Sequence, residues 1–127
     1  MRYLIISITT VSLLIGSWLI FFSYSSKNID IYTVFLKDEI LPAVEAENWE
    51  ESNSLMKKLG DDWHKYKKTA LLFLDTQTIN EIDYSLARAE KYVKAEDVSN
   101  SSGELNSMIE QLTFLKQNDE VTFANIL

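Results

Sequence analysis

Close to its N-terminus the chain carries twenty consecutive residues without a charge, from Tyr3 to Phe22. As a helix rising about 1.5 Å per residue, this stretch is about 30 Å long, which matches the hydrocarbon core of a bilayer. Aromatic residues gather at its far end, as is typical of membrane–water interfaces: Trp18, Phe21, Phe22 and Tyr24. The pattern predicts a single transmembrane anchor over residues 1–26, followed by a domain outside the membrane over residues 27–127.

The charges around the stretch predict its orientation. Arg2 and Lys27 flank it, and the other ten basic residues lie beyond it with all nineteen acidic residues, a balance of about −9. Cytoplasmic segments next to a membrane helix are enriched in Lys and Arg. Although Lys27 opposes Arg2, the balance favours a cytoplasmic N-terminus and an extracytoplasmic domain.

A cleaved signal peptide is the alternative to an anchor. Ser23-Tyr24-Ser25 has small residues at the spacing of a cleavage site. The uncharged stretch is longer than the apolar core of about 7–15 residues that signal peptides carry, which favours the anchor. Cysteine is absent, so a lipid-modified N-terminal cysteine is excluded.

Composition narrows the class of the remaining domain. One proline and three glycines favour long helices over strands joined by turns. Without cysteine there is no disulfide, thiol chemistry or cysteine metal site. The acidic balance argues against a nucleic-acid partner, since phosphate backbones attract positive patches. The basic run Lys65-Tyr66-Lys67-Lys68 is the local exception, and we expect it to be a solvated helix face.

Apolar residues recur at spacings of three and four in four further stretches, and each predicts one face of an amphipathic helix. The four stripes are Ile29, Tyr32, Leu36, Ile40 and Val44; Trp49, Met56, Leu59, Trp63 and Tyr66; Ile79, Ile82, Leu86, Ala89 and Val93; and Leu105, Met108, Leu112 and Leu115. The predicted fold is all-α, with a small antiparallel bundle of three to four helices after the transmembrane helix. We expect Trp63, Ile82, Leu86 and Leu112 to share one core, and the C-terminal Phe123, Ile126 and Leu127 to dock on the bundle.

Capping patterns predict where these helices begin. A capping residue followed three positions later by glutamate is typical of a helix N-terminus, and it occurs at Asn48/Glu51, Thr78/Glu81 and Ser101/Glu104. The stretch Val98–Gly103, rich in Ser and Asn, predicts a loop before the last of these helices.

Two residues, Pro42 and Gly60, could interrupt the predicted helices. Pro42 cannot donate a hydrogen bond to the carbonyl of Asp38, so we expect it to interrupt and kink the first helix of the domain. Gly60 either lies within a continuous helix or marks a break with Asp61 capping a new one. The unbroken apolar stripe around Gly60 favours continuity.

The sequence carries no catalytic or metal-binding signature, and it predicts no cofactor. His64 is the only histidine, and no nucleophile stands in a recognisable catalytic pattern. The acidic clusters lack the alternating oxygen ligands and glycine of a calcium loop, so we expect solvated acidic faces. Glycine-rich phosphate loops are also absent.

Trp49 and Trp63 lie four helical turns apart on one face. Core packing is the simpler interpretation of this spacing, and an aromatic-lined ligand groove is the alternative.

Small residues mark one face of the predicted anchor. Thr9, Ser12 and Gly16 follow each other at spacings of three and four. In lipid, close backbone approach at small residues drives helix association. The spacing therefore predicts a partner-binding face, for another membrane protein or a second copy of the chain, with chance occurrence of small residues as the alternative.

Six short segments of the chain carry a family resemblance. The segments are Asn48-Trp49-Glu50-Glu51; Trp63 followed by Lys67-Lys68; Leu72-Phe73-Leu74-Asp75; Ile79 followed by Ile82-Asp83; Ser85-Leu86-Ala87-Arg88; and Asn125-Ile126-Leu127. Together they resemble domain-of-unknown-function family 4363. The resemblance covers nearly the whole chain, and its more specific parts are the Ser-Leu-Ala-Arg stretch and the Asn-Ile-Leu ending.

The resemblance implies a small bacterial protein with one N-terminal membrane helix and a helical outer domain, often encoded near a polytopic membrane protein of the YetF type. It implies no activity and no catalytic residue. Many members carry a histidine where this chain has Thr76. We therefore expect a non-enzymatic, membrane-anchored accessory or interaction protein of the bacterial cell envelope; the alternative is an extracytoplasmic module that binds a small ligand or cell-wall fragment in an aromatic groove.

Overall fold

The computed structural model describes residues 1–126, except for the side chains of residue 119 and residues 121–126. The predicted docking of Phe123, Ile126 and Leu127 thus lies outside the described residues. No strand occurs in the described part of the chain, and the all-α prediction is confirmed. The helices are α1 (Arg2–Phe35), the π-helical turn η1 (Leu36–Ile40), α2 (Leu41–Glu45), α3 (Trp49–Ala70), α4 (Thr76–Lys94) and α5 (Val98–Ile126).

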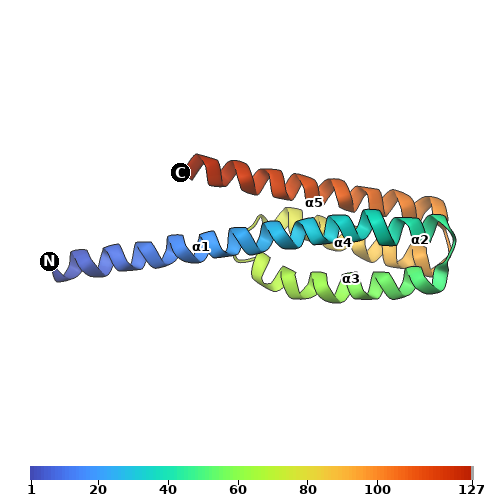
Figure 1. Cartoon of the computed structure of the whole chain (residues 1–127), viewed down its shortest axis with the longest axis horizontal. Coiled ribbons are helices and arrows are strands. Elements are labelled where there is room, and N and C mark those ends of the chain that lie inside the picture. Colours follow the sequence, from blue (N-terminus) through green and yellow to red (C-terminus); the bar gives the residue numbers. More distant parts are fainter. Residues whose placement is uncertain (127) are drawn as a thin grey trace.

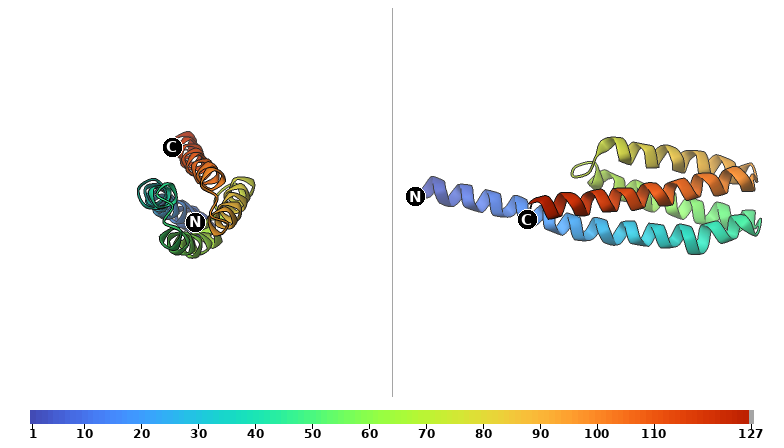
Figure 2. Two further views of the ribbon diagram at one scale, coloured as in Figure 1. Left: turned by 90° about the vertical axis from the view of Figure 1, so that its right-hand side faces the viewer. Right: turned by 90° about the horizontal axis from the view of Figure 1, so that it is seen from above.

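The helices form an antiparallel four-helix bundle (Figure 1). α1, η1 and α2 follow one another without a break as one rod, and α3, α4 and α5 are the other three members. Seen end on, α1–α2, α3, α4 and α5 follow one another around the core, so α4 lies opposite the rod (Figure 2). Chain neighbours are therefore spatial neighbours, as in up-down-up-down bundles.

The predicted stripes meet in one core. Trp63, Ile82, Leu86 and Leu112 are all buried within a single apolar cluster, as expected. Every other residue of the four stripes is also buried except Trp49, which is half-buried against the same cluster. This agreement follows from the 3.6-residue period, which directs each stripe toward the bundle axis.

The N-terminal half of α1 projects alone from the bundle (Figures 1 and 2). Its apolar side chains are exposed all round the helix, among them Leu4, Ile5, Leu13 and Ile20. The rod that contains it, Arg2–Glu45, is long and apolar enough to cross a membrane. In the bundle half of α1 the burial changes to one face, with Ile29 and Tyr32 directed inward.

A π turn interrupts the regular α-helix directly before Pro42, and the rod then continues past the proline to Glu45. The backbone N–H of Leu41 donates to the carbonyl of Leu36, five residues back, at the end of η1. A single π turn therefore widens the helix directly before the residue that cannot donate. The missing donor thus changes the hydrogen-bond register over one turn without ending the helix.

Two nearly identical turns close the end of the bundle far from the projecting half of α1. They run through Ala46-Glu47-Asn48 and Ala95-Glu96-Asp97, and Glu47 and Glu96 both adopt a φ of 56°. In each turn the last two N–H groups bond back to the preceding helix in the Schellman pattern: Glu47 to Val44 and Asn48 to Ala43, Glu96 to Val93 and Asp97 to Tyr92.

The predicted N-cap at Asn48 is confirmed. Its side chain accepts a hydrogen bond from the Glu51 N–H at 3.3 Å, and its amide donates to the Glu51 carboxylate at 3.0 Å. In a regular capping box the Glu51 carboxylate would accept from the backbone N–H of Asn48. Here that N–H already bonds to the carbonyl of Ala43, so the carboxylate accepts from the side-chain amide of Asn48 instead.

The predicted caps at Thr78 and Ser101, and the loop over Val98–Gly103, are wrong. Asp75 caps α4 by accepting from the Thr78 N–H at 3.1 Å, and Asp97 caps α5 by accepting from the Asn100 N–H at 3.0 Å. Each helix therefore begins three to four residues earlier than expected. Aspartate competes well with Ser and Thr as an N-cap, and the residues after Asp97 are helical despite their low propensity.

The two hairpins of the bundle, the rod with α3 and α4 with α5, share a sequence pattern at their turns. The sequence pattern Val-x-Ala-Glu-Asn/Asp-x-x-x-Ser begins at Val44 in the first and at Val93 in the second, 49 residues later. Upstream of η1 the separation of buried partners is 50 residues, as for Ile29 and Ile79. The separation changes from 50 to 49 residues across η1, which indicates that the π turn accommodates one extra residue in the first hairpin.

Candidate functional site

No cluster of three or more His, Cys, Asp or Glu residues that could hold a metal ion occurs in the described part of the chain. His64 has an exposed side chain, and its Nδ1 lies 3.9 Å from the Asp83 carboxylate. The structure therefore places the only histidine at the surface of α3, beside an acid that has closer partners.

Asp83 joins α4 to α3 through two hydrogen bonds. Its carboxylate accepts from the Trp63 Nε1–H at 3.1 Å and from the Lys67 ammonium at 2.7 Å. Burial alone would raise the pKa of Asp83, but these bonds, with the positive charge of Lys67, bring the pKa below its usual value. Asp83 is thus held ionised and links the two helices. The Trp63 N–H and the Lys67 ammonium already donate to Asp83, so neither is left to bind a ligand.

A cluster of aromatic residues lies where α1 enters the bundle. Tyr32 contacts both Trp63 and Tyr66 edge-on, with ring centroids 6.2 and 5.7 Å apart. Its hydroxyl donates to the carbonyl of Asp62 at 3.2 Å, and the Tyr66 hydroxyl bonds to the buried Ser25. Burial raises the pKa of Tyr32, so its hydroxyl stays neutral. These contacts bind the end of the predicted anchor to α3.

The two tryptophans do not form a groove. Trp63 is only 2% exposed, in the centre of the core, and Trp49 is half-buried against it. Core packing is therefore the role that the structure gives them, and a ligand-binding module would need another site.

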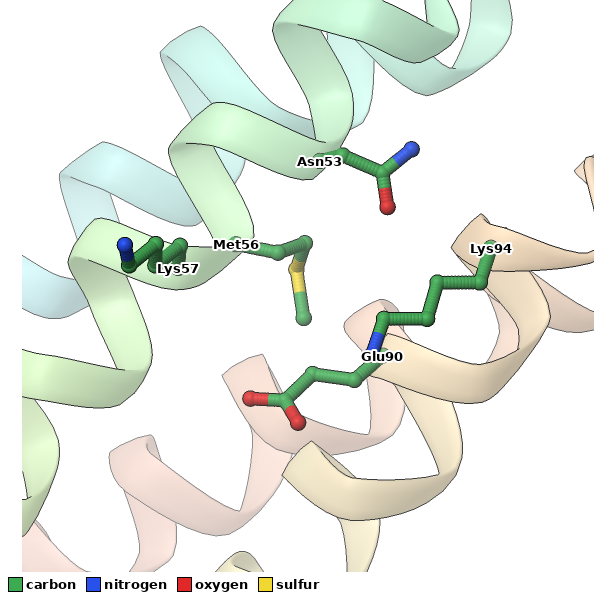
Figure 3. A pocket seen from close by; sticks show the side chains of 5 residues that line it. All are labelled: Asn53, Met56, Lys57, Glu90 and Lys94. Atoms are coloured by element: carbon green, nitrogen blue, oxygen red, sulfur yellow. The ribbon is translucent and has the colours of Figure 1, made fainter.

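A cavity of about 250 Å³ lies between α3 and α4 near the far turns (Figure 3). Its lining residues are Asn53, Met56, Lys57, Glu90 and Lys94. The helices approach closely beside it at Gly60, where a Cβ would lie 3.0 Å from the Glu90 carboxylate, and α3 continues through this glycine as predicted. The cavity is smaller than most sites for drug-sized ligands, and its charges sit on long flexible side chains.

The family follows from a comparison with family models. The model described as Domain of unknown function (DUF4363) matches residues 23–126. The chain belongs to this family. The match confirms the resemblance seen in the sequence. Comparisons with curated proteins and with solved structures gave no match.

The DUF4363 match begins within the predicted anchor, and the structure gives a reason. Phe21 and Ser25 precede the predicted start of the domain, yet both are buried, Phe21 against Phe73 and Ser25 against Tyr66. The matched region therefore begins directly after the apolar stretch and includes Ser25, which packs in the bundle. Thr76 is the exposed first residue of α4.

The predicted partner-binding residues of this DUF4363 chain lie on the projecting half of α1. Thr9 and Ser12 are exposed, and a Cβ at Gly16 would meet no other part of the described chain within 4 Å. The Thr9 hydroxyl donates to the carbonyl of Ile5 at 2.8 Å, within its own helix. Within the described chain, Gly16 thus has open space beside it, and the Thr9 hydroxyl donates within α1.

Proposed function

We propose that the chain is a non-enzymatic accessory subunit of the bacterial cell envelope, which α1 anchors in the membrane with its N-terminus in the cytoplasm and its bundle outside. Its partner is another membrane protein, and the family resemblance favours a polytopic one of the YetF type. The carrying observation is the continuous rod from Arg2 to Glu45, which is both the exposed apolar helix and one wall of the bundle.

The continuity of the rod matters because a domain tethered only for localisation needs no fixed orientation. Here no flexible linker separates the apolar half of α1 from the bundle, and Ser25 and Phe21 fasten the junction. Helix geometry therefore couples the height and rotation of the bundle to those of the membrane segment. Such coupling suits a subunit that presents its outer surface to a partner held in the same membrane.

We further propose that Thr9, Ser12 and Gly16 form the contact within the membrane, with a polytopic partner or a second copy of the chain. Helices associate in lipid through close packing at small residues, and each interhelical hydrogen bond adds only about 0.6–2 kcal/mol. Because the Thr9 hydroxyl already donates within α1, packing at Gly16 should dominate.

Crosslinking and co-purification from membranes test this contact. Gly16→Leu should reduce partner recovery while leaving the amount of inserted protein unchanged. Ser7→Leu is the matched control, since Ser7 lies about 200° around the helix from Thr9, on the opposite face. Equal recovery with both variants would show that the anchor carries no partner-binding face and that any contact is made by the bundle.

Protease treatment of intact protoplasts tests the orientation separately. The bundle should be digested while the membrane segment is retained. A protected bundle would reverse the proposed topology, and a soluble secreted product that begins near Ser26 would show that the apolar stretch is removed as a signal peptide.

A further inference from the structure

The turn between α3 and α4 is the apolar exception among the turns of the bundle. It carries four apolar residues in succession, Leu71-Leu72-Phe73-Leu74, and three of them are at least partly open to solvent: Leu71 is 37%, Leu72 78% and Phe73 39% exposed. The two turns at the opposite end are acidic instead, with Glu47 and Glu96 at their tips. If all three turns faced water, each would be expected to carry polar tips. The apolar residues of the α3–α4 turn therefore indicate that its surroundings differ from those of the two acidic turns.

The position of this turn along α1 identifies what surrounds it. The Phe73 ring stacks on Phe21, with ring centroids 4.3 Å apart and planes 14° from parallel. Phe21 belongs to the uncharged stretch of α1 and precedes its first charged neighbour, Lys27. The turn therefore lies beside the last part of the predicted membrane span rather than beyond it, as the ribbon views also show (Figure 2).

The backbone of the turn is suited to an apolar environment. The N–H groups of Leu71, Leu72, Phe73 and Leu74 all bond to carbonyls of Lys67, Thr69 or Ala70, at 2.8–3.1 Å. Unsatisfied amides are what bars most loops from lipid. This turn carries its own hydrogen bonds, so entry of its tip into a bilayer leaves none of these four donors unpaired.

A cavity of about 290 Å³ lies between the turn and α1, lined chiefly by apolar groups of Ile20, Phe21, Tyr24 and Phe73, with Ser17 and Thr69. At the depth of Phe21 its natural filling is the acyl chain of a lipid. In water the same surface would be a hydrated apolar hollow beside the exposed Leu72.

Charge follows the same arrangement. Lys68 and Lys65 are exposed one and two helical turns before Leu72, about 6 and 10 Å along α3. The polar headgroup layer on each side of a bilayer has a similar thickness of about 5–8 Å. Lys67 is already paired with Asp83, and the ionised Asp75 at the start of α4 limits how deeply the turn can enter.

We propose that the α3–α4 turn is a second membrane contact: Leu72 and Phe73 enter the edge of the hydrocarbon region beside α1, and Lys65 and Lys68 meet anionic lipid headgroups. The contact rests on the proposed membrane anchoring by α1. It gives the bundle two attachments to the bilayer, the span and this turn, and it explains why an acidic domain carries its one basic run at this end.

Spin-label depth measurements on the full chain test the proposal. Because the chain has no cysteine, Leu72→Cys, Ile20→Cys and Glu47→Cys each give a single labelling site. Each labelled protein is reconstituted into vesicles of phosphatidylethanolamine and phosphatidylglycerol in equal parts. Collision with oxygen, relative to a water-soluble nickel complex, should be several-fold higher at residues 72 and 20 than at residue 47.

The three positions separate failure of this inference from failure of the anchor. A label at residue 20 that favours oxygen, with one at residue 72 that favours the nickel complex, would overturn the membrane contact while leaving the anchor intact. Nickel access at residue 20 would overturn both. Low collision with both reagents at residue 72 would indicate a protein surface there and would also overturn the proposal. Leu72 is exposed, so its replacement should leave the bundle folded.

Discussion

The two hairpins of the bundle bury equivalent positions with different chemistry. Tyr32, Trp63 and Tyr66 in the first hairpin correspond to Ile82, Leu112 and Leu115 in the second, at separations of 50, 49 and 49 residues. All six are buried, but the first set brings hydroxyl and indole donors and the second brings none. Tyrosine and tryptophan suit sites where one end of the ring is apolar and the other meets polar groups.

The difference shows that two hairpins with the same spacing of buried residues can pack in different local environments. The first hairpin contains α1, so its base adjoins the apolar half of α1 that we propose to span the membrane, and its polar groups form hydrogen bonds with Ser25, Asp62 and Asp83. The second hairpin fills its part of the core mainly with aliphatic side chains, and its buried polar side chains are the small Thr78, Ser85 and Ser101. If the hairpins are structurally equivalent, paired substitutions should have equal effects except where these polar contacts or the membrane intervene.

The largest effect is expected at Leu36 and Leu86, which correspond between the hairpins and are both buried. Replacement of either by alanine should lower the free energy of unfolding by about 2–5 kcal/mol, through lost apolar contact and the cavity left behind. Urea unfolding of the full chain in detergent micelles, followed by near-ultraviolet circular dichroism, measures it. A Leu36→Ala variant as stable as the parent, beside a destabilised Leu86→Ala variant, would break the equivalence.

The next effect concerns Asp83, whose counterpart in the first hairpin is Thr33. Asp83→Asn should cost about 1–3 kcal/mol, because it removes the charged partner of Lys67 in a half-buried setting. Since the pKa of Asp83 is lower in the folded state, this stabilisation is present above the unfolded-state pKa of about 3.9 and is lost as pH falls through the folded pKa.

Urea unfolding of wild type and Asp83→Asn across acidic pH measures that loss. The difference between them should shrink below about pH 4. Asp61→Asn, an exposed position on α3, is the control and should change little. A difference that stays constant down to the lowest pH would contradict the proposed ionic link.

A smaller effect distinguishes the two N-caps at the far turns. Asn48→Ala should cost about 1 kcal/mol at any pH, because an amide cap does not titrate. Asp97→Ala should destabilise as well, but its effect should depend on pH. Hydrogen bonds from the backbone and the side chain of Asn100 lower the pKa of Asp97, so its contribution is lost as pH falls through that value.

Thermal unfolding at neutral and at acidic pH measures both caps. If Asn48→Ala and Asp97→Ala respond alike to acidification, Asp97 does not cap α5 as an ionised carboxylate.

The smallest effect is expected at Glu47 and Glu96, which share a φ of 56°. This left-handed conformation favours glycine, while glycine also makes the unfolded chain more flexible. Glu47→Gly and Glu96→Gly should each stabilise the bundle by about 0.5 kcal/mol, the net of these opposing effects. Unequal shifts in the urea midpoint of the two variants would show that the two turns do not contribute equally to the stability of the bundle.

The sequence predicted the helical core well because burial follows a simple period. The stripes through Ile79 and Leu105, and the cap at Asn48, needed only local spacing. Thr78 and Ser101 were misassigned because Asp75 and Asp97, three to four residues earlier, satisfy the helix starts first. The choice between neighbouring capping residues depends on where the previous helix ends, and spacing within one helix does not contain that information.

Other features required three dimensions. The hairpin correspondence is hidden because the separation changes from 50 to 49 residues at η1, although the two Ala-Glu-Asn/Asp turns were a signal for it. The run Leu71–Leu74 was visible in the sequence, but only its stacking on Phe21 relates it to the depth of the anchor. Conversely, nothing in the fold distinguishes the face of Thr9, Ser12 and Gly16 from its neighbours, so that face stays a prediction.

The unbroken rod also has a mechanical consequence. From Lys27 to Glu45 it rises through the bundle for about 27 Å, and membrane helices adopt tilts between about 0 and 40°. A change of about 20° in the tilt of the membrane segment would sweep the far turns about 9 Å parallel to the bilayer surface. If the apolar half of α1 spans the membrane as proposed, a small change in its tilt therefore becomes a large displacement of the acidic turns, which lie at the other end of the rod from Ser25.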